Sequence, residues 1–196
     1  GYVRFYELLG FIPKTISNFT KNVEMIFNKK RDLLIVVGGG SLPPQLYDRP
    51  HEDELQPNRD RMEEQVIHYC VAHGIPIIAT CRGMQYINVM FGGKLWYHPK
   101  LPVNRTRGVD HQVWLVKEQR NIWVNNYHSD CIYEEGLASC FEPLAIDREN
   151  HVVEAYGSDE MKILALQWHP ERRFETANAY EETRKIILDF IQKYVK

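Results

Sequence analysis

Cys81 stands where a strand is expected to meet a helix. The apolar run 75–79 precedes it, and Arg82-Gly83-Met84-Gln85 follows at once, a pattern typical of a nucleophile elbow. Ala79 and Gly83, two residues to either side, are small enough for so tight a turn. The free N–H groups at a helix start favour an anion. The sequence therefore predicts that Cys81 loses its proton more readily than a thiol in water and acts as a nucleophile.

A base and an orienting carboxylate are available in His169-Pro170-Glu171, directly after a predicted strand. Residues two apart in an extended segment face the same way, and Pro170 stiffens the link between them. A nucleophilic cysteine needs an imidazole to take its proton and return it to the leaving group, and a carboxylate to orient that imidazole. The spacing thus favours a triad of Cys81, His169 and Glu171.

Gly38-Gly39-Gly40 follows the apolar run 33–37 and offers backbone N–H groups without side chains. Such groups can stabilise a developing oxyanion, and the N–H of Arg82, next to the nucleophile, is the expected second donor. The three features all follow strand ends, which is where open α/β sheets bind their ligands.

The surrounding pattern predicts an α/β domain. Its strand–helix–strand–helix order implies a parallel sheet covered on both faces. Because the sequence opens on a helix, we expect an initial strand to be absent from it. The proline-bearing loop 41–58 is expected to help form the site. We expect helices over 1–9, 23–29, 60–73, 82–91 and 177–195, an extended segment over 11–17, and strands over 33–37, 75–80, 95–98, 111–116, 122–125, 144–146, 152–156 and 163–167, the later ones partly antiparallel.

Composition restricts the class of protein. The chain has 196 residues, a formal net charge of −2 and no basic block, so it suits one domain over 1–196 and does not indicate nucleic acid or an anionic membrane as a partner. Because no apolar run is long enough for a membrane span and none opens the sequence, we expect neither a membrane span nor a signal peptide. The four cysteines lack the spacing of a disulfide framework, which predicts reduced thiols in a cytoplasmic protein.

Four segments together resemble a known family. They are Gly-Gly-Gly-Ser-Leu-Pro-Pro-Gln-Leu-Tyr at 38–47, Cys-Arg-Gly-Met-Gln at 81–85, Val-Asn-Asn-Tyr-His at 124–128 and Gln-Trp-His-Pro-Glu at 167–171. Their order and separation resemble class I glutamine amidotransferase-like hydrolases, and within them the γ-glutamyl-γ-aminobutyrate hydrolase group, peptidase family C26. The resemblance covers nearly the whole chain. It implies a flavodoxin-like fold, with a mostly parallel sheet, helices on both faces and a small antiparallel extension.

The resemblance also implies roles. Attack on a γ-glutamyl amide would release an amine and leave a γ-glutamyl thioester, which water then hydrolyses to glutamate. No metal and no organic cofactor is required, and the expected partner is the small-molecule substrate. The residues implied are Cys81 as nucleophile, His169 as base and then acid, Glu171 as orienting carboxylate, Gly39 or Gly40 with Arg82 as oxyanion donors, and Gln85, Asn126, Tyr127 and His128 around the γ-glutamyl group.

Two departures from the family pattern bear on the substrate. Ser41 stands where relatives commonly carry aspartate after the glycines, and the segment between Gly93 and Asn125 is short. This compact form resembles members associated with bacterial surface-polysaccharide (capsule) pathways, in which the conjugate can carry a nucleotide-linked phosphoramidate. Arg105 and Arg107 are candidates for binding such a phosphate, although a solvated loop is the default interpretation.

Other interpretations stay open at the level of sequence. The same triad would serve a glutaminase subunit that passes ammonia to a separate synthetase, and a binding protein could retain a dead site. Cys81 alone could be a buried core thiol. His68, Cys70 and His73 suggest a metal site on one helix, but their phase is poor and amphipathic packing explains them. The glycine run lacks the Gly-Lys-Ser/Thr of a phosphate loop. The oligomeric state is open, with a homodimer among the alternatives.

Overall fold

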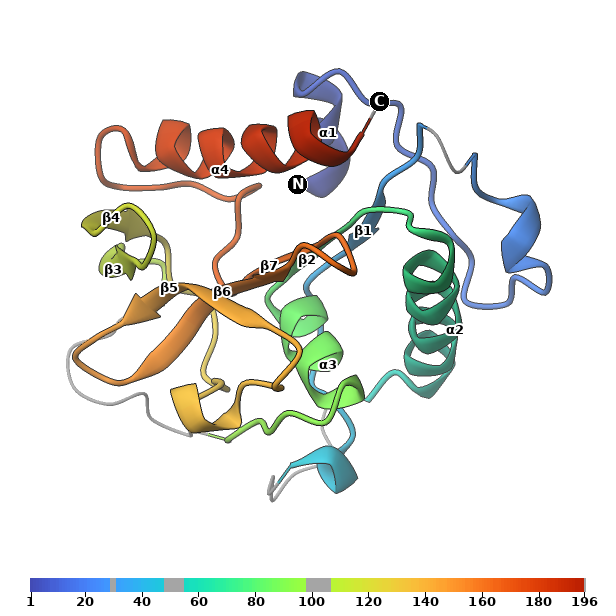
Figure 1. Cartoon of the computed structure of the whole chain (residues 1–196), viewed down its shortest axis with the longest axis horizontal. Coiled ribbons are helices and arrows are strands. Elements are labelled where there is room, and N and C mark those ends of the chain that lie inside the picture. The colour runs from blue at the N-terminus through green and yellow to red at the C-terminus, as the bar shows by residue number, and fades with distance from the viewer. Residues whose placement is uncertain (29–30, 48–54, 98–106, 196) are drawn as a thin grey trace.

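The computed structural model describes residues 1–28, 31–47, 55–97 and 107–195. Its elements alternate helix and strand in the first half and are mainly strands in the second (Figure 1). In chain order they are α1 (Tyr2–Leu8), η1 (Val23–Met25), β1 (Leu34–Val36), η2 (Pro44–Leu46), α2 (Pro57–His73), β2 (Ile77–Thr80), α3 (Arg82–Met90), β3 (His111–Leu115), β4 (Arg120–Val124), η3 (Glu134–Gly136), β5 (Glu142–Asp147), β6 (Val152–Ser158), β7 (Ile163–Leu166) and α4 (Ala179–Tyr194).

The strands of the described residues form one sheet in the order β1-β2-β7-β6-β5-β3-β4. β1, β2 and β7 pair in parallel, and every later pair is antiparallel. The α/β class is therefore confirmed, and the expected antiparallel extension comprises β6, β5, β3 and β4. Antiparallel neighbours need only a short turn between them, whereas parallel ones need a crossover. Accordingly, no α-helix lies between β3 and β7.

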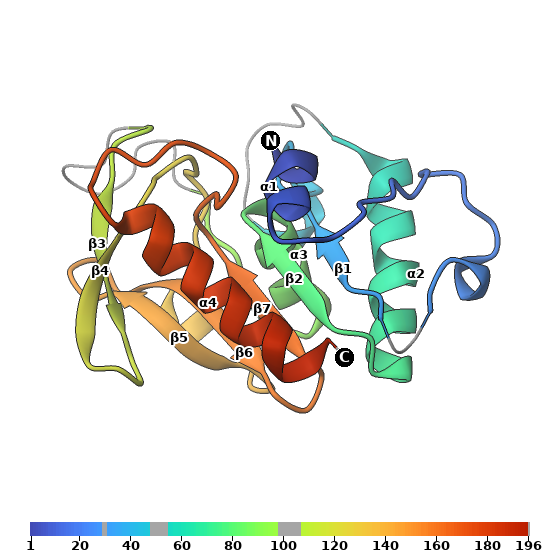
Figure 2. The same cartoon turned by 90° about the horizontal axis from the view of Figure 1, so that it is seen from above.

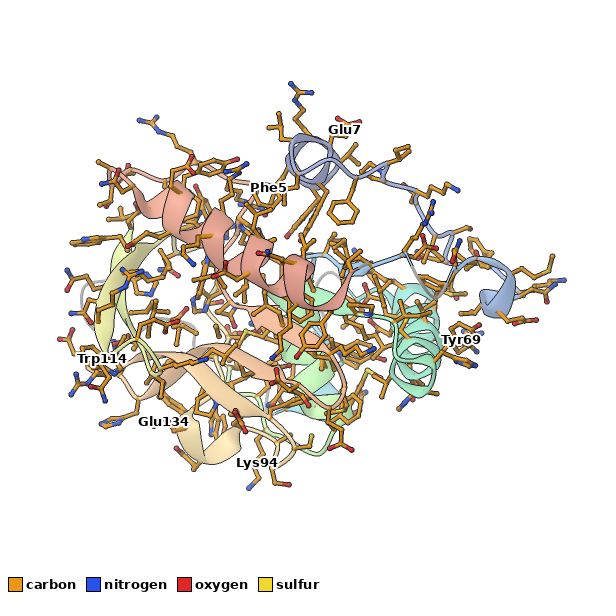
Figure 3. The ribbon with its side chains drawn as sticks, turned by 45° about the horizontal axis from the view of Figure 1, so that its top comes forward. Phe5, Glu7, Tyr69, Lys94, Trp114 and Glu134 are labelled. Carbon is orange, nitrogen blue, oxygen red and sulfur yellow. The ribbon has the colours of Figure 1, made fainter. Side chains whose placement is uncertain are left out.

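Helices cover both faces of the sheet, as the strand–helix order predicted. α2 and α3 pack on one face, where Ile67 of α2 and Met84 of α3 belong to the same buried cluster as Ile77 of β2. α1 and α4 lie on the other face (Figures 1 and 2), where Phe5 and Ile187 belong to the same buried cluster. Figure 3 shows Phe5 between these two helices, and its ring meets that of Tyr180 edge-on at 6.2 Å. This contact anchors α1 over the parallel part of the sheet.

Several boundaries differ from the expectation. α2 begins at Pro57, three residues before the predicted start, because proline's fixed φ and missing N–H suit the first helical position. The expected strand over 95–98 is reduced to one bridge between Trp96 and Cys131, and His98 lies outside the described residues. The segment 11–17 belongs to no helix or strand of the described chain.

Two further expectations concern the second predicted helix and the thiols. The predicted helix over 23–29 is only the short turn η1, and Lys29 lies outside the described residues. All four cysteines are free, three of them buried and Cys140 exposed, in agreement with the predicted reduced thiols. Among the described residues no helix has the length and apolarity needed to cross a membrane.

Candidate active site

The predicted elbow is present at the junction of β2 and α3. Cys81 has a φ of 52°, a left-handed value that is strained for a residue with a side chain. Its N–H donates to the Leu166 carbonyl of β7 at 2.8 Å, and its carbonyl accepts the Gln85 N–H at 3.0 Å. The neighbouring strand and the first helical turn thus hold the strained residue in place, with its side chain at the carboxyl end of the parallel strands.

Gly83 is required for a reason that the sequence did not show. A Cβ at this position would lie 2.5 Å from the Val36 carbonyl oxygen of β1, a distance too short for any side chain. Gly83 is therefore needed so that α3 can pack closely against β1. The turn at Cys81 is not the reason that a small residue is required. Without Gly83, α3 would move away from β1 and carry the elbow with it.

The predicted readiness of the Cys81 thiol to ionise is wrong for this structure. Burial raises the pKa of Cys81 to about 12, and the nearby charges of Glu171 and Asp130 raise it too. The Arg82 N–H and the charge of Arg172 favour the thiolate but do not compensate for burial. The Cys81 thiol is therefore neutral, and a base would have to remove its proton before it could act as a nucleophile.

His169 and Glu171 face each other as their spacing predicted. His169 Nδ1 lies 2.7 Å from Glu171 Oε1, and both side chains are almost fully buried. This short bond places the proton of a neutral imidazole on Nδ1, which leaves Nε2 to accept a proton from another group. Glu171 thus fixes both the orientation and the tautomer that a base requires.

The glycine turn brings this pair and the cysteine together. A Cβ on Gly38 would lie 2.8 Å from His169 Cε1 and 3.6 Å from Cys81 Cβ. Gly38 therefore lies against both residues, and a side chain there would occupy the space between them. The three features that the sequence singled out separately converge on one site.

Asn125 holds the backbone of His169. Its side-chain Nδ2 donates to the His169 carbonyl at 2.8 Å, and its Oδ1 accepts the His169 N–H at 2.9 Å. Sequence reasoning did not assign a role to Asn125, although it lies in one of the recognised segments. The sequence shows only that an amide side chain follows directly after a predicted strand. That pattern does not identify His169, 44 residues away, as the partner of Asn125.

Tyr2 is a second residue that the sequence analysis missed. Its hydroxyl accepts the Gly38 N–H at 3.0 Å and lies 3.2 Å from His169 Nδ1. Burial, reinforced by the charge of Glu171, raises the pKa of Tyr2 well above its ordinary value, so the group is a neutral phenol. Nothing in the local pattern of α1 points to this contact, because its partners lie 36 and 167 residues away.

Arg82 is the most deeply buried charged residue around the elbow. Its guanidinium pairs with Asp60 and, at 2.5 Å, with Glu63, both on α2. Both terminal nitrogens of the side chain are therefore paired with α2, while the backbone N–H of Arg82 faces Cys81. Only the backbone N–H of Arg82 is therefore left to act as the oxyanion donor that the sequence predicted.

The residues expected around the γ-glutamyl group divide into two sets. The Tyr127 ring meets that of His169 edge-on at 5.6 Å and lies 4.4 Å below the Arg172 guanidinium. The Gln85 amide donates to the Asp130 carbonyl at 3.0 Å and to Gln167 Oε1 at 3.2 Å. Tyr127 therefore borders His169 directly, whereas the Gln85 side chain is turned into the fold.

Asn126 and His128 are both buried. His128 directs Nδ1 to the Asp130 carbonyl at 3.1 Å and Nε2 toward Glu154 Oε1 at 3.6 Å, and the Asn126 side-chain oxygen has no hydrogen-bond partner among the described residues. Of the phosphate candidates, Arg105 lies outside the described residues and Arg107 is exposed. In the described part of the chain, no three His, Cys, Asp or Glu side chains are grouped as metal ligands.

Comparison with known proteins identifies the family of the chain. The peptidase C26 family model matches residues 2–171. The glutamine amidotransferase-like protein YvdE of Lactococcus lactis is 30% identical over 164 residues, covering 74% of this chain and 68% of that protein. The γ-glutamyl-γ-aminobutyrate hydrolase PuuD of Escherichia coli is 26% identical over 175 residues, covering 76% and 67%.

The fold has relatives among solved structures. A Thermoplasma acidophilum protein assigned to GMP synthase superposes with a TM-score of 0.70, at 20% identity, over 98% of this chain and 87% of that one. At this identity the likeness concerns the fold. Because the family model spans most of the sequence, from α1 through Glu171, the chain belongs to the peptidase C26 family and is an enzyme of the hydrolase and glutamine amidotransferase-like class.

Proposed function

We propose that the chain hydrolyses a γ-glutamyl amide, with Cys81 as nucleophile, His169 as base and then acid, and Glu171 as the orienting carboxylate. The observation that carries this proposal is the 2.7 Å bond between His169 Nδ1 and Glu171 Oε1, on a histidine that shares the Gly38 turn with Cys81. The family assignment supports the hydrolysis of γ-glutamyl amides in general.

In the first half of the reaction, His169 Nε2 takes the thiol proton as Cys81 Sγ attacks the amide carbon. The carbonyl oxygen becomes an oxyanion, which accepts hydrogen bonds from the Arg82 N–H and from the N–H of Gly39 or Gly40. His169 then gives its proton to the departing amine, the C–N bond breaks and a γ-glutamyl thioester remains. A buried neutral thiol suits this sequence, because proton removal and attack occur together.

In the second half, His169 removes a proton from water, which attacks the thioester carbon. The C–S bond breaks, the proton returns to Cys81, and glutamate leaves. The glutamyl group would be held by the segment from Asn126 to His128, with Tyr127 next to His169. Gln85, whose side chain is turned into the fold, would support this pocket through its bonds to Asp130 and Gln167. All of these steps use groups of the chain itself and water.

The substrate consists of a γ-glutamyl group and a leaving amine, and the family assignment bears on the first of these more than on the second. We propose a nucleotide-linked phosphoramidate of a surface-polysaccharide pathway as one such amine, on the strength of Ser41 and the short segment after Gly93. A panel of γ-glutamyl amines that includes nucleotide-bearing conjugates tests this choice directly. Cleavage of simple amine conjugates alone would remove the nucleotide from the proposal.

Glutamate release from this panel tests the reaction itself. The wild-type chain should release glutamate from at least one conjugate, and Cys81→Ala should abolish the release. Cys140→Ala is the matched control. Cys140 is exposed and has no part in the proposed mechanism, so this variant should release glutamate as the wild type does. Release that persists in Cys81→Ala would exclude Cys81 as nucleophile. Cleavage of free glutamine alone, increasing with a synthetase partner, would indicate a glutaminase subunit instead.

A further inference from the structure

Arg59 on α2 contacts the backbone of the glycine turn. Its Nη2 donates to the Val37 carbonyl at 2.6 Å and to the Gly38 carbonyl at 3.2 Å. From the opposite side, the Gly38 N–H donates to the Tyr2 hydroxyl at 3.0 Å. The peptide plane between Val37 and Gly38 is therefore held at both of its polar ends.

The direction of the next peptide follows from the same geometry. No cis peptide bond is present in the described chain, and in a trans peptide the C=O and N–H point in opposite directions. Since the Gly38 carbonyl points at Arg59, the Gly39 N–H must point away from α2, as the Gly38 N–H does toward Tyr2. Among the described residues no hydrogen bond occupies the Gly39 N–H, so it is available to an acceptor bound beside Cys81.

Arg59 is itself held firmly. Its Nε donates to Glu63 Oε1 at 2.6 Å and its Nη1 to Gln56 Oε1 at 3.0 Å. The second oxygen of Glu63 accepts from Arg82 Nη1 at 2.5 Å. Glu63 thus joins two guanidiniums, one that grips the glycine turn and one that belongs to the residue after Cys81.

The absence of a side chain at Gly39 completes this arrangement. A Cβ on Gly39 would overlap Arg59 Nη1 and lie 3.3 Å from Arg82 Cδ. Any other residue at this position would displace the Arg59 guanidinium from the two carbonyls. Gly38 and Gly39 are therefore needed for different reasons, the first to leave room for His169 and the second to admit Arg59.

We propose that Arg59 is a positioning residue of the oxyanion site, which turns the Gly38–Gly39 peptide so that the Gly39 N–H faces the carbonyl attacked by Cys81. Through Glu63 the same ion network steadies Arg82, so that α2 aligns both oxyanion donors. This inference rests on the proposed function and selects Gly39, rather than Gly40, as the donor from the turn.

The test compares Arg59→Met with Arg61→Met, a matched change on the exposed side of the same helix. On the conjugate cleaved by the wild type, Arg59→Met should lower kcat by about 10- to 100-fold, less than the roughly 10²–10³ that follows removal of an oxyanion donor outright. KM should change by less than about threefold, because ground-state binding does not use the oxyanion donors. Arg61→Met should match the wild type.

Inhibitor affinity separates positioning from general damage to the fold. The Cys81 thiol adds to the aldehyde of 5-oxopentanoate, which lacks the α-amino group that would cyclise glutamate γ-semialdehyde. The product is a hemithioacetal whose tetrahedral carbon carries an oxygen in the oxyanion position, whereas glutamate binds without such an adduct. Arg59→Met should weaken the aldehyde in parallel with kcat and leave glutamate affinity nearly unchanged. Equal weakening of both ligands, or unchanged kcat and aldehyde affinity, would overturn the proposal.

Gly39→Ala provides a second route if Arg59→Met folds poorly. The added Cβ should push the Arg59 guanidinium away from the Val37 and Gly38 carbonyls and lower kcat to a similar extent. The double variant should have nearly the same kcat as Arg59→Met alone, because both changes break the same contact between Arg59 and the glycine turn. Full additivity of the two changes would contradict the inference. If the wild type cleaves no conjugate, the proposed function fails and this inference fails with it; a wild type that cleaves while Arg59→Met is unimpaired refutes only the role of Arg59.

Discussion

The hydroxyl of Tyr2 lies 3.2 Å from Nδ1 of His169 and accepts the N–H of Gly38 at 3.0 Å. One phenol from the first helix thus touches both the imidazole and the glycine turn of the candidate site. Its neutral state, maintained by burial, allows it to accept from a backbone N–H without adding a negative charge beside Glu171.

Removal of this hydroxyl should reduce both stability and turnover. In Tyr2→Phe the Gly38 N–H loses its partner, and we expect the free energy of unfolding to fall by about 1–3 kcal/mol and kcat by several-fold as the turn loosens. Urea unfolding and steady-state kinetics measure the two effects. Tyr180→Phe is the control, since the Tyr180 ring packs against Phe5 and its hydroxyl forms no hydrogen bond among the described residues. Equal behaviour of the two variants would argue against a special role for Tyr2.

The Cys81 thiol should make stability depend on alkaline pH. Its pKa is raised from 9.0 to about 12 by burial, so between these values the unfolded state loses a proton that the folded state keeps. The contribution of Cys81 is therefore fully present below about pH 9 and is lost as the pH rises toward 12, at about 1.4 kcal/mol per pH unit. Urea unfolding at about pH 8 and about pH 10 should show a larger loss in the wild type than in Cys81→Ala. Parallel losses in the two proteins would contradict the raised pKa.

Gly83→Ala should destabilise the fold through the backbone contact with β1. The added Cβ would meet the Val36 carbonyl oxygen at 2.5 Å, and neither the strand nor the first turn of α3 can yield cheaply. We expect a loss of about 1–3 kcal/mol or more in the free energy of unfolding, together with reduced turnover because Cys81 moves with the helix. Thermal or urea unfolding measures the first effect. A variant as stable as the wild type would show that α3 can shift freely.

A graded series at Asn125 should report on the His169 backbone. Asn125→Ala leaves both the N–H and the C=O of His169 without partners, at a cost of about 1–3 kcal/mol for each buried group, and should lower kcat. Asn125→Asp keeps the acceptor and loses the donor, so its stability should be intermediate. The exposed Asn121 on the preceding strand supplies the control as Asn121→Ala. If the Asp and Ala variants are equally stable, the bond from the His169 N–H to the side-chain oxygen of residue 125 contributes nothing.

The sequence predicted what local patterns encode. The elbow at Cys81 and the pairing of His169 with Glu171 depend on residues within a few positions of one another, and both are present. Arg59, Asn125 and Tyr2 act on partners 21 to 167 residues away. No local pattern carries that information, because the fold brings these residues together only when α1, α2 and β4 pack on the sheet.

The protonation state of Cys81 shows the same limit in energetic terms. A helix N-terminus is visible in the sequence and predicts a lower pKa for Cys81, whereas the burial of the thiol in the folded chain is not visible and dominates. Similarly, Pro57 marks the true start of α2, but the pattern of apolar residues placed the start at Asp60. A local pattern such as a helix N-terminus shows that one influence on a residue exists. The packing of the whole chain decides whether that influence or burial is the larger.

The pairing of His169 with Glu171, and the contact of His169 with Tyr2, have a consequence for the synthesis of the chain. Cys81 leaves the ribosome before His169 and Glu171, because it precedes them in the sequence. The contacts of His169 with Tyr2, Asn125 and Glu171 can therefore form only after the segment that follows β7 has been synthesised. If these residues carry the reaction as proposed, a chain that ends before His169 should release no glutamate.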